Sequence, residues 1–139
     1  MPSLVTIRTI QPEDTYWLRH SVLWPEKPLD YVKIAEDNEG LHFGAFQEEQ
    51  LVGVISLFVN GEAARFRKFA VDPRYQRLGI GSELLTRVMQ EASQQGARTI
   101  ACDARQEATG LYYKFGMLPE GPEFYKGPIA YVRMQKALP

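Results

Sequence analysis

The chain has few of the features that mark secreted, membrane-inserted or repetitive proteins. Cys102 is its single cysteine, which excludes an internal disulfide and suits a reducing compartment. No apolar run approaches the ~20 residues that span a bilayer, and the N-terminus lacks a charged segment followed by an apolar one. Repeats and low-complexity tracts are also missing. These absences predict a cytoplasmic protein that does not bind membranes.

An excess of charge of one sign is missing as well. The net charge is −1 over 139 residues, so we expect no nucleic acid partner. His20 and His42 stand apart, and no ligand spacing predicts a metal site. Cations nevertheless gather in one stretch, which favours a small polyanion as ligand: Arg65, Arg67, Lys68, Arg74 and Arg77. With 45% hydrophobic and 24% charged residues, the chain fits one globular domain, residues 1–139.

The order of predicted elements indicates an α+β fold with a mixed sheet flanked by helices. Hydrophobic patterns and turn residues predict strands over 5–8, 41–46, 51–59, 63–71, 98–104, 117–120 and 129–136. Helices are predicted over 12–23, 29–36, 80–95 and 107–115. Short turns make the strands between 41 and 71 antiparallel neighbours. The helix over 80–95 crosses between the fourth and fifth strands, which predicts a parallel pair there.

The run from Val71 to Ser82 ends a strand, turns at Pro73 and begins the long helix. Its order is Val-x-Pro, then Gln-x-x-Gly-x-Gly, then helix. At such a junction the first backbone N–H groups of the helix have no partner, and the helix dipole favours an anion. Glycine removes the Cβ that would block close approach. The run therefore predicts a site for a phosphate-bearing ligand.

Two other phosphate-binding loops are excluded by individual residues. A dinucleotide fingerprint needs a third glycine three residues after the second, and Leu84 stands there. A P-loop ends in Gly-Lys-Ser or Gly-Lys-Thr, whereas Gly81 is followed by Ser82 and Glu83.

A second motif runs from Ala108 to Met117 and reads Ala-Thr-Gly-Leu-Tyr-Tyr-Lys-Phe-Gly-Met. Together and in this order, the two motifs resemble the acetyl-CoA signature and the Ala-x-x-Phe/Leu-Tyr-x-Lys-x-Gly-Phe helix of the GCN5-related N-acetyltransferase (GNAT) family. Met117 replaces the usual Phe. The tail over 121–125 and 129–134 resembles the small bacterial ElaA-like branch, although Tyr131 stands where that branch usually has His.

The resemblance implies the GNAT fold, in which the parallel pair of strands splays apart around the cofactor. It also implies acetyl-CoA as co-substrate and an amine of a small molecule or peptide as acceptor. Backbone N–H groups of residues 77–82 would hold the pyrophosphate, and residues 69–71 would run along the pantetheine arm. The implied cofactor-binding residues are Phe69, Ala70, Val71, Gln76, Arg77, Leu78, Gly79, Ile80, Gly81, Ser82, Tyr112 and Lys114.

The resemblance makes Tyr112 the predicted catalytic residue, because a phenol with a pKa of about 10 can protonate the leaving sulfur without ionising first. Neighbouring Tyr113 would point about 100° away on the helix and is assigned to packing or surface. No general base is predicted. Arg65 stands where some family members carry Glu, and the remaining candidates are each better explained as structural or solvated: His20, Glu26, Asp103 and Tyr125.

Two functions remain open from the sequence. The first is acetyl transfer by direct attack of a primary amine. The second is a catalytically silent module that binds acyl-CoA as a sensor or a partner-binding protein. The acceptor pocket is expected near the first helix and the tail, and four residues suggest a mixed apolar and acidic pocket suited to a cation: Trp24, Glu26, Phe124 and Tyr125. A homodimer is compatible with the sequence, which does not determine the oligomeric state.

Overall fold

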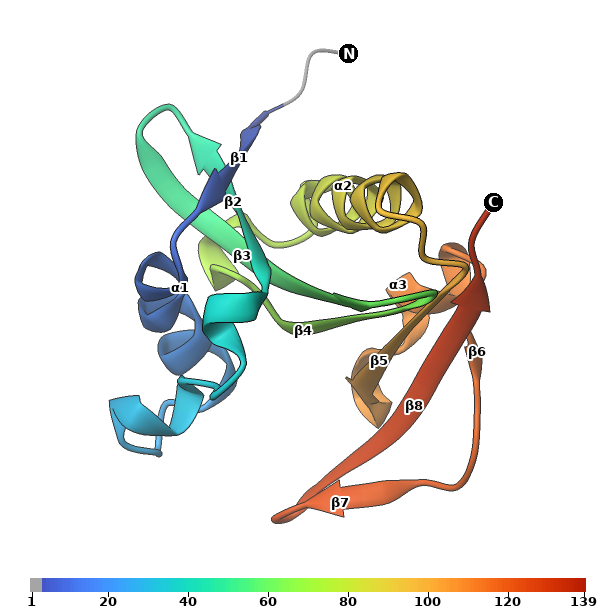
Figure 1. The fold of residues 1–139 in the computed structure, drawn as a ribbon. Helices are drawn as coiled ribbons and strands as arrows, with labels where there is room; N and C mark the ends of the chain where they lie inside the picture. The colour runs from blue at the N-terminus through green and yellow to red at the C-terminus, as the bar shows by residue number, and fades with distance from the viewer. Residues whose placement is uncertain (1–3) are drawn as a thin grey trace.

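The computed structural model describes residues 4–139, and within this range one eight-stranded sheet forms the body of the fold (Figure 1). The sheet has the order β1-β2-β3-β4-β5-β8-β6, and β7 also pairs with β8. Its strands are β1 (Thr6–Ile10), β2 (Leu41–Gln47), β3 (Gln50–Asn60), β4 (Ala63–Val71), β5 (Thr99–Arg105), β6 (Leu118–Pro119), β7 (Phe124–Lys126) and β8 (Ile129–Ala137). In the described part of the chain β4 and β5 pair in parallel and the other pairings are antiparallel, which confirms the predicted mixed sheet.

The parallel pairing is short. Residues 63–65 of β4 pair with residues 99–101 of β5, after which the two strands part (Figure 1). A β-bulge also interrupts β4, because its pairing with β3 jumps from Arg67 to Ala70 while β3 advances from Ser56 to Val54. Lys68 lies in this bulge with φ of +55°, a left-handed conformation that costs a non-glycine residue about 1–3 kcal/mol. The bulge bends β4 beside the opening.

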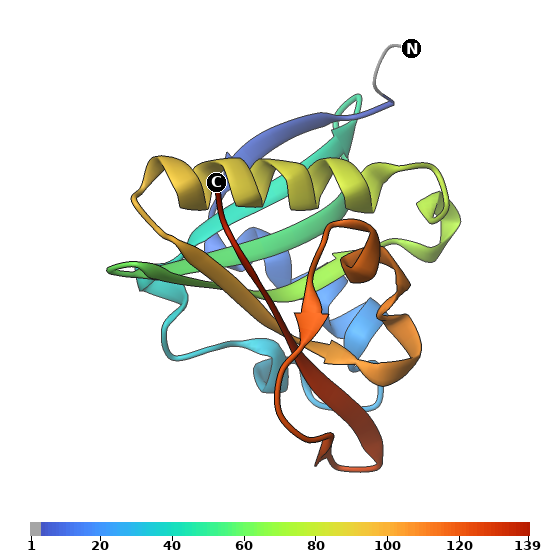
Figure 2. The same ribbon diagram turned by 90° about the vertical axis from the view of Figure 1, so that its right-hand side faces the viewer.

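Helices cover both faces of the sheet. The long helix α2 (Ile80–Gln94) buries its apolar stripe against β1–β4, and Figure 2 shows it lying across the strands. On the other face lie α1 (Pro12–Leu18) and a π-helical turn, Arg19–Leu23. Leu18, at the end of α1, packs on Val54 and Ala70. No helix in residues 4–139 is long and apolar enough to cross a membrane.

Several predicted helices are shorter than their patterns suggested. The helix predicted over 29–36 is wrong, because two 3₁₀ turns, Leu29–Val32 and Asp37–Glu39, take its place. The Asp37 carboxylate accepts the Ile34 N–H at 3.0 Å, which offers the backbone an alternative to a helix. In the segment 107–115 only α3 (Gly110–Lys114) is α-helical, after a 3₁₀ turn over Gln106–Ala108. Strand β7 was not predicted; a turn at Gly127 with φ of +59° pairs it with β8.

A buried ion pair joins the π-helical turn to the sheet. The Arg19 guanidinium, fully buried, donates to both Asp37 carboxylate oxygens at 2.8 and 2.9 Å and to Ser56 Oγ of β3 at 2.9 Å. Burial alone would raise the pKa of Asp37, but hydrogen bonds from Arg19 and the Ile34 backbone, with the charge of Arg19, outweigh it and lower that pKa. The pair holds the irregular segment between α1 and β2 against the face that carries the site.

We predict that Asp37→Asn lowers the free energy of unfolding by about 3–5 kcal/mol, because it leaves the Arg19 charge buried without a counter-charge. Urea unfolding at pH 7 measures this loss. The matched control is Asp30→Asn, which removes an exposed pair with Lys33 and should cost far less, because solvent screens the two charges. The lowered Asp37 pKa makes its contribution complete above pH ~4 and lost as the pH falls through the folded-state pKa. Equal losses for the two variants would contradict a stabilising role for the buried pair.

Candidate functional site

A groove begins where β4 runs into α2. Gly79, with φ of +84°, is the N-cap of α2, and Arg77 before it has φ of +66°. The first helical hydrogen bond runs from Glu83 N to Gly79 O, so the N–H groups of residues 80–82 have no partner within the helix. Such groups at the positive end of a helix dipole form an anion site. The groove measures about 480 Å³.

Local hydrogen bonds fix the turn that leads into this helix. Asp72 accepts the Arg74 backbone N–H at 3.0 Å and the Arg74 guanidinium at 2.9 Å. Gln76 donates its side-chain N–H to the Val71 carbonyl at 3.0 Å. The Asp-Pro order suits such a turn, because the aspartate side chain accepts from the backbone two residues on and proline fixes φ. The turn is thereby shaped by the motif itself.

The structure brings most of the predicted cofactor-binding residues together. Those that line the groove are Phe69, Ala70, Val71, Gln76, Arg77, Gly79, Gly81, Ser82 and Tyr112. Three predicted residues do not line it: Leu78 is half-exposed on the turn, the side chain of Ile80 is buried in the core, and Lys114 is exposed on α3. The groove also includes residues that are not among the predicted cofactor-binding residues: Val22, Leu23, Tyr75, Arg105, Glu107, Ala108 and Leu111. Apart from Tyr75, they come from elements that carry no phosphate motif.

Tyr112 lies between the groove and a second, deeper space. Its ring packs against Phe66 and Phe69 of β4, with centroids 5.7 and 6.4 Å apart. Burial, and to a lesser degree neighbouring Cys102, raises the pKa of Tyr112, so the phenol keeps its proton at neutral and mildly alkaline pH. Tyr113 is about half-exposed, as expected for a side chain about 100° further around the helix. Cys102 is buried, and burial with Asp103 raises the pKa of its thiol to about 12, which leaves it unreactive.

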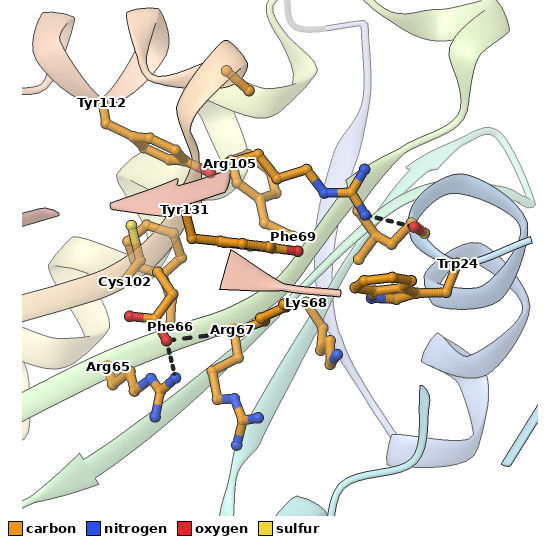
Figure 3. Close-up of a pocket in the computed structure, with 14 residues that line it drawn as sticks. Trp24, Arg65, Phe66, Arg67, Lys68, Phe69, Cys102, Arg105, Tyr112 and Tyr131 are labelled. Carbon is orange, nitrogen blue, oxygen red and sulfur yellow. Dashed lines mark hydrogen bonds and ion pairs between the residues drawn. The ribbon is translucent and has the colours of Figure 1, made fainter. Parts of the chain in front are cut away.

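The deeper space is a cavity of about 150 Å³ in the gap between β4 and β5 (Figure 3). Figure 3 shows Tyr112 and Cys102 on one side of it and Trp24 on the other, with Arg105 reaching toward Trp24. The Arg105 guanidinium lies 5.2 Å from the Trp24 ring centroid and donates to the Leu23 carbonyl. Groove and cavity adjoin, because they share five lining residues: Leu23, Phe69, Arg105, Ala108 and Tyr112.

Positive charge dominates the cavity. It is lined by five cationic side chains (Arg65, Arg67, Lys68, Arg105 and Lys126) and one carboxylate, that of Asp103. Asp103 is already engaged by Arg65 at 2.7 Å, by Arg133 at 3.2 Å and by Lys126 at 3.8 Å. Burial lowers the pKa of Lys68 to about 8, and four nearby cations add to this effect: Arg67, Lys126, Arg19 and Arg105.

The residues expected to form an acidic pocket for a cation do not come together in this cavity. Trp24 does line the cavity, but Glu26 is exposed outside it, and Tyr125 is exposed and bonded to Glu123. Phe124 stacks on Tyr131 instead of lining the space itself. The charged residues that β4 contributes to the cavity lining are instead basic: Arg65, Arg67 and Lys68. Arg65, in the place of a family glutamate, is bound to Asp103 and cannot replace a carboxylate base.

The comparisons with known proteins agree with this geometry. The acetyltransferase (GNAT) domain family matches residues 24–138. An uncharacterized N-acetyltransferase of Bacillus subtilis, YitI, is 30% identical over 130 residues, which cover 87% of each protein.

Two solved structures share the fold. ElaA of Escherichia coli is 13% identical and superposes with a TM-score of 0.80 over 95% of this chain and 99% of its own. A GNAT family acetyltransferase of Elizabethkingia anophelis with acetyl-CoA bound is 19% identical, with a TM-score of 0.76 over 99% and 100% of the two chains. Because the family match spans most of the chain and joins both motifs, the chain belongs to the GNAT family of acetyltransferases and is an N-acetyltransferase.

Proposed function

We propose that the protein transfers the acetyl group of acetyl-CoA to a primary amine of a small molecule or a peptide by direct attack. The observation that carries this proposal is that the groove and the cavity adjoin at Tyr112, which lines both. A ligand with its phosphates at the start of α2 could extend along the groove to Tyr112. An amine in the cavity could approach Tyr112 from the cavity side.

The residues at the start of α2 fit the phosphates of such a ligand. A Cβ added at Gly81 would lie 3.3 Å from the Phe69 ring and 3.5 Å from Leu111, so a side chain there would take up groove space. The N–H groups of residues 77–82 would donate to the pyrophosphate, including that of Ile80, whose side chain is in the core. Arg77 would add a positive charge. Leu78 and Lys114 lie too far to the outside to line the groove and are supported only by the motif.

The edge of β4 fits the pantetheine arm. Beyond Arg65, β4 has parted from β5, and residues 69–71 line the groove. This edge of β4 is not paired with β5, although the Val71 carbonyl already accepts from Gln76, and an extended ligand could pair with it as an added strand does. The bulge at Lys68 changes the direction of the backbone beside this edge. We propose that an N–H group of this strand donates to the thioester oxygen.

The chemistry requires one proton to leave the amine and one to reach the sulfur. When bound, acetyl-CoA supplies a thioester whose carbon accepts the amine nitrogen while its bond to sulfur breaks. Tyr112 lies where the groove meets the cavity, and its raised pKa keeps the proton that the sulfur needs. The described cavity offers no free carboxylate, since Asp103 is bound by cations, so water is the acceptor we propose for the amine proton.

We predict that Gly81→Asp weakens acetyl-CoA binding at least tenfold, about 1.4 kcal/mol, because a Cβ and a negative charge enter the phosphate site. Isothermal titration calorimetry measures the dissociation constant. The control is Gln90→Asp, which adds the same charge to an exposed position of α2 and should bind acetyl-CoA as the unmodified protein does. Unchanged affinity in Gly81→Asp would remove the pyrophosphate from this turn.

We predict that Tyr112→Phe lowers kcat by about 10²-fold, the usual contribution of a general acid, with little effect on acetyl-CoA affinity. Release of the CoA thiol across a panel of amines measures both this effect and the proposed activity. Tyr113→Phe is the control and should retain full turnover, because that ring points to solvent. Since the pKa of Tyr112 is raised, kcat should show no loss from phenol ionisation up to pH ~10. A fully active Tyr112→Phe protein would exclude the phenol from proton transfer.

A further inference from the structure

The cavity holds positive charge that the protein itself does not neutralise. Lys68 has no hydrogen bond, ion pair or aromatic contact of its side chain in residues 4–139, although it is half-buried. Arg105 donates to a backbone carbonyl and has no acidic partner in the same range. The Arg67 pair with Glu36, at 3.7 Å, is long and its acid is exposed. Asp103, the sole acid lining the cavity, is already shared among three cations.

Such an arrangement costs stability unless something pairs with it. Removing a charge from water is unfavourable without a counter-charge, and Lys68 is also held in a left-handed backbone conformation. The buried Arg19 shows the contrast, because the fold supplies Asp37 for it. Charges left unpaired inside a ligand cavity are typical of a site whose missing partner is the ligand.

We infer that the acceptor is an amine that also carries an anionic group, a carboxylate or a phosphate, which binds at Lys68 and Arg105. The inference rests on the proposed acetyl transfer. Its amine would face Tyr112, and its anionic group would lie toward Trp24 and the free cations (Figure 3). A cavity of about 150 Å³ holds a molecule of benzene size, which limits the inner part of the acceptor to a small group.

The test compares amines that differ in the charge at their far end. β-Alanine, β-alaninamide and 1,3-diaminopropane supply an anionic, a neutral and a cationic end, and phosphoethanolamine with ethanolamine repeats the comparison for phosphate. We expect kcat/KM to be at least tenfold higher for the anionic member than for its neutral partner, and lowest for the diamine. The larger of the two anionic preferences identifies carboxylate or phosphate as the natural group.

Variants of Lys68 then test whether the preference for anionic amines depends on this side chain. Lys68→Met should reduce the ratio of anionic to neutral kcat/KM by about tenfold, mainly by raising the KM of the anionic amines. Lys68→Arg should retain the preference. Lys33→Met is the control, since it removes an exposed lysine outside the cavity and should leave the ratio unaltered. An equal fall in kcat for neutral and anionic amines would instead make Lys68 a base and would overturn the inference.

A binding measurement separates this inference from the proposed function. Calorimetry with phosphoethanolamine and β-alanine, in the presence of CoA, should show binding that Lys68→Met weakens. Binding of this kind without acetyl transfer would refute the proposed activity and leave the anionic site standing. Acetylation of neutral amines without any anionic preference would support the proposed activity and refute the anionic site. If the protein showed no anionic preference and no binding that depends on Lys68, the inference would be overturned.

The stability of the free protein gives an independent prediction. Unfolded lysine has a pKa of about 10.4, so with Lys68 near 8 the unfolded chain binds more protons between these values, and stability rises with pH there. Below pH 8 the full cost of the charge is present. Lys68→Met should therefore raise Tm at pH 7 by roughly 3 °C, with a gain that shrinks toward pH 10. The charged or titratable groups around Lys68 are Arg65, Arg67, Cys102, Asp103, Arg105, Tyr112, Lys126, Tyr131 and Arg19.

Thermal unfolding followed at pH 7 and pH 10 measures this effect, with Lys33→Met as the control. A lower Tm for Lys68→Met at pH 7 would show that the side chain stabilises the fold. That result would remove the main reason for assigning an external anion to it.

Discussion

The separation of β4 from β5 beyond residues 65 and 101 is the constraint on which the site depends. Two strands that pair in parallel over three residues and then part leave an unpaired backbone edge and an opening at the middle of a sheet. Aromatic rings from β4 and α3, those of Phe66, Phe69 and Tyr112, fill one part of the opening. The Arg65–Asp103 pair bridges the two strands near its base. Without the separation there would be no route between the proposed phosphate site and the proposed acceptor cavity.

Two buried or half-buried cations of this fold differ in whether they have an acidic partner. Arg19 lies in the core with Asp37 and Ser56 as partners, and this pair fastens irregular chain to β3. Lys68 lies at a bulge beside the opening, surrounded by other cations. In the first arrangement each charge has its partner, so the loss of one partner alone is costly. The second is expected to lower stability while it creates a positive field in a small cavity, and such a cost is common where a protein must bind a ligand.

Much of the site was predictable because it depends on local chemistry. Pro73, Gln76, Gly79 and Gly81 specify a turn and a helix start through φ preferences and free N–H groups, and those effects act over a few residues. The crossover of α2 likewise predicted the parallel pair. Predictions failed where local and tertiary preferences compete, as at Asp37, whose side chain binds the Ile34 backbone and Arg19. The short helix α3 is similarly set by packing on β4.

Consecutive residues predicted the proposed cofactor site, because a phosphate site at a helix start is local in the chain. The residue pattern also predicted the antiparallel strands over 41–71, the parallel pair and the position of Tyr112 in its motif, but not that β8 lies between β5 and β6. The proposed acceptor site became visible only in the folded chain. The cavity collects Trp24, Lys68, Arg105 and Lys126 from four separate segments, and the sign of its charge reversed the sequence expectation. The physical reason is that an electrostatic field depends on distances in space, and the bulge in β4 and the parting of the strands set those distances.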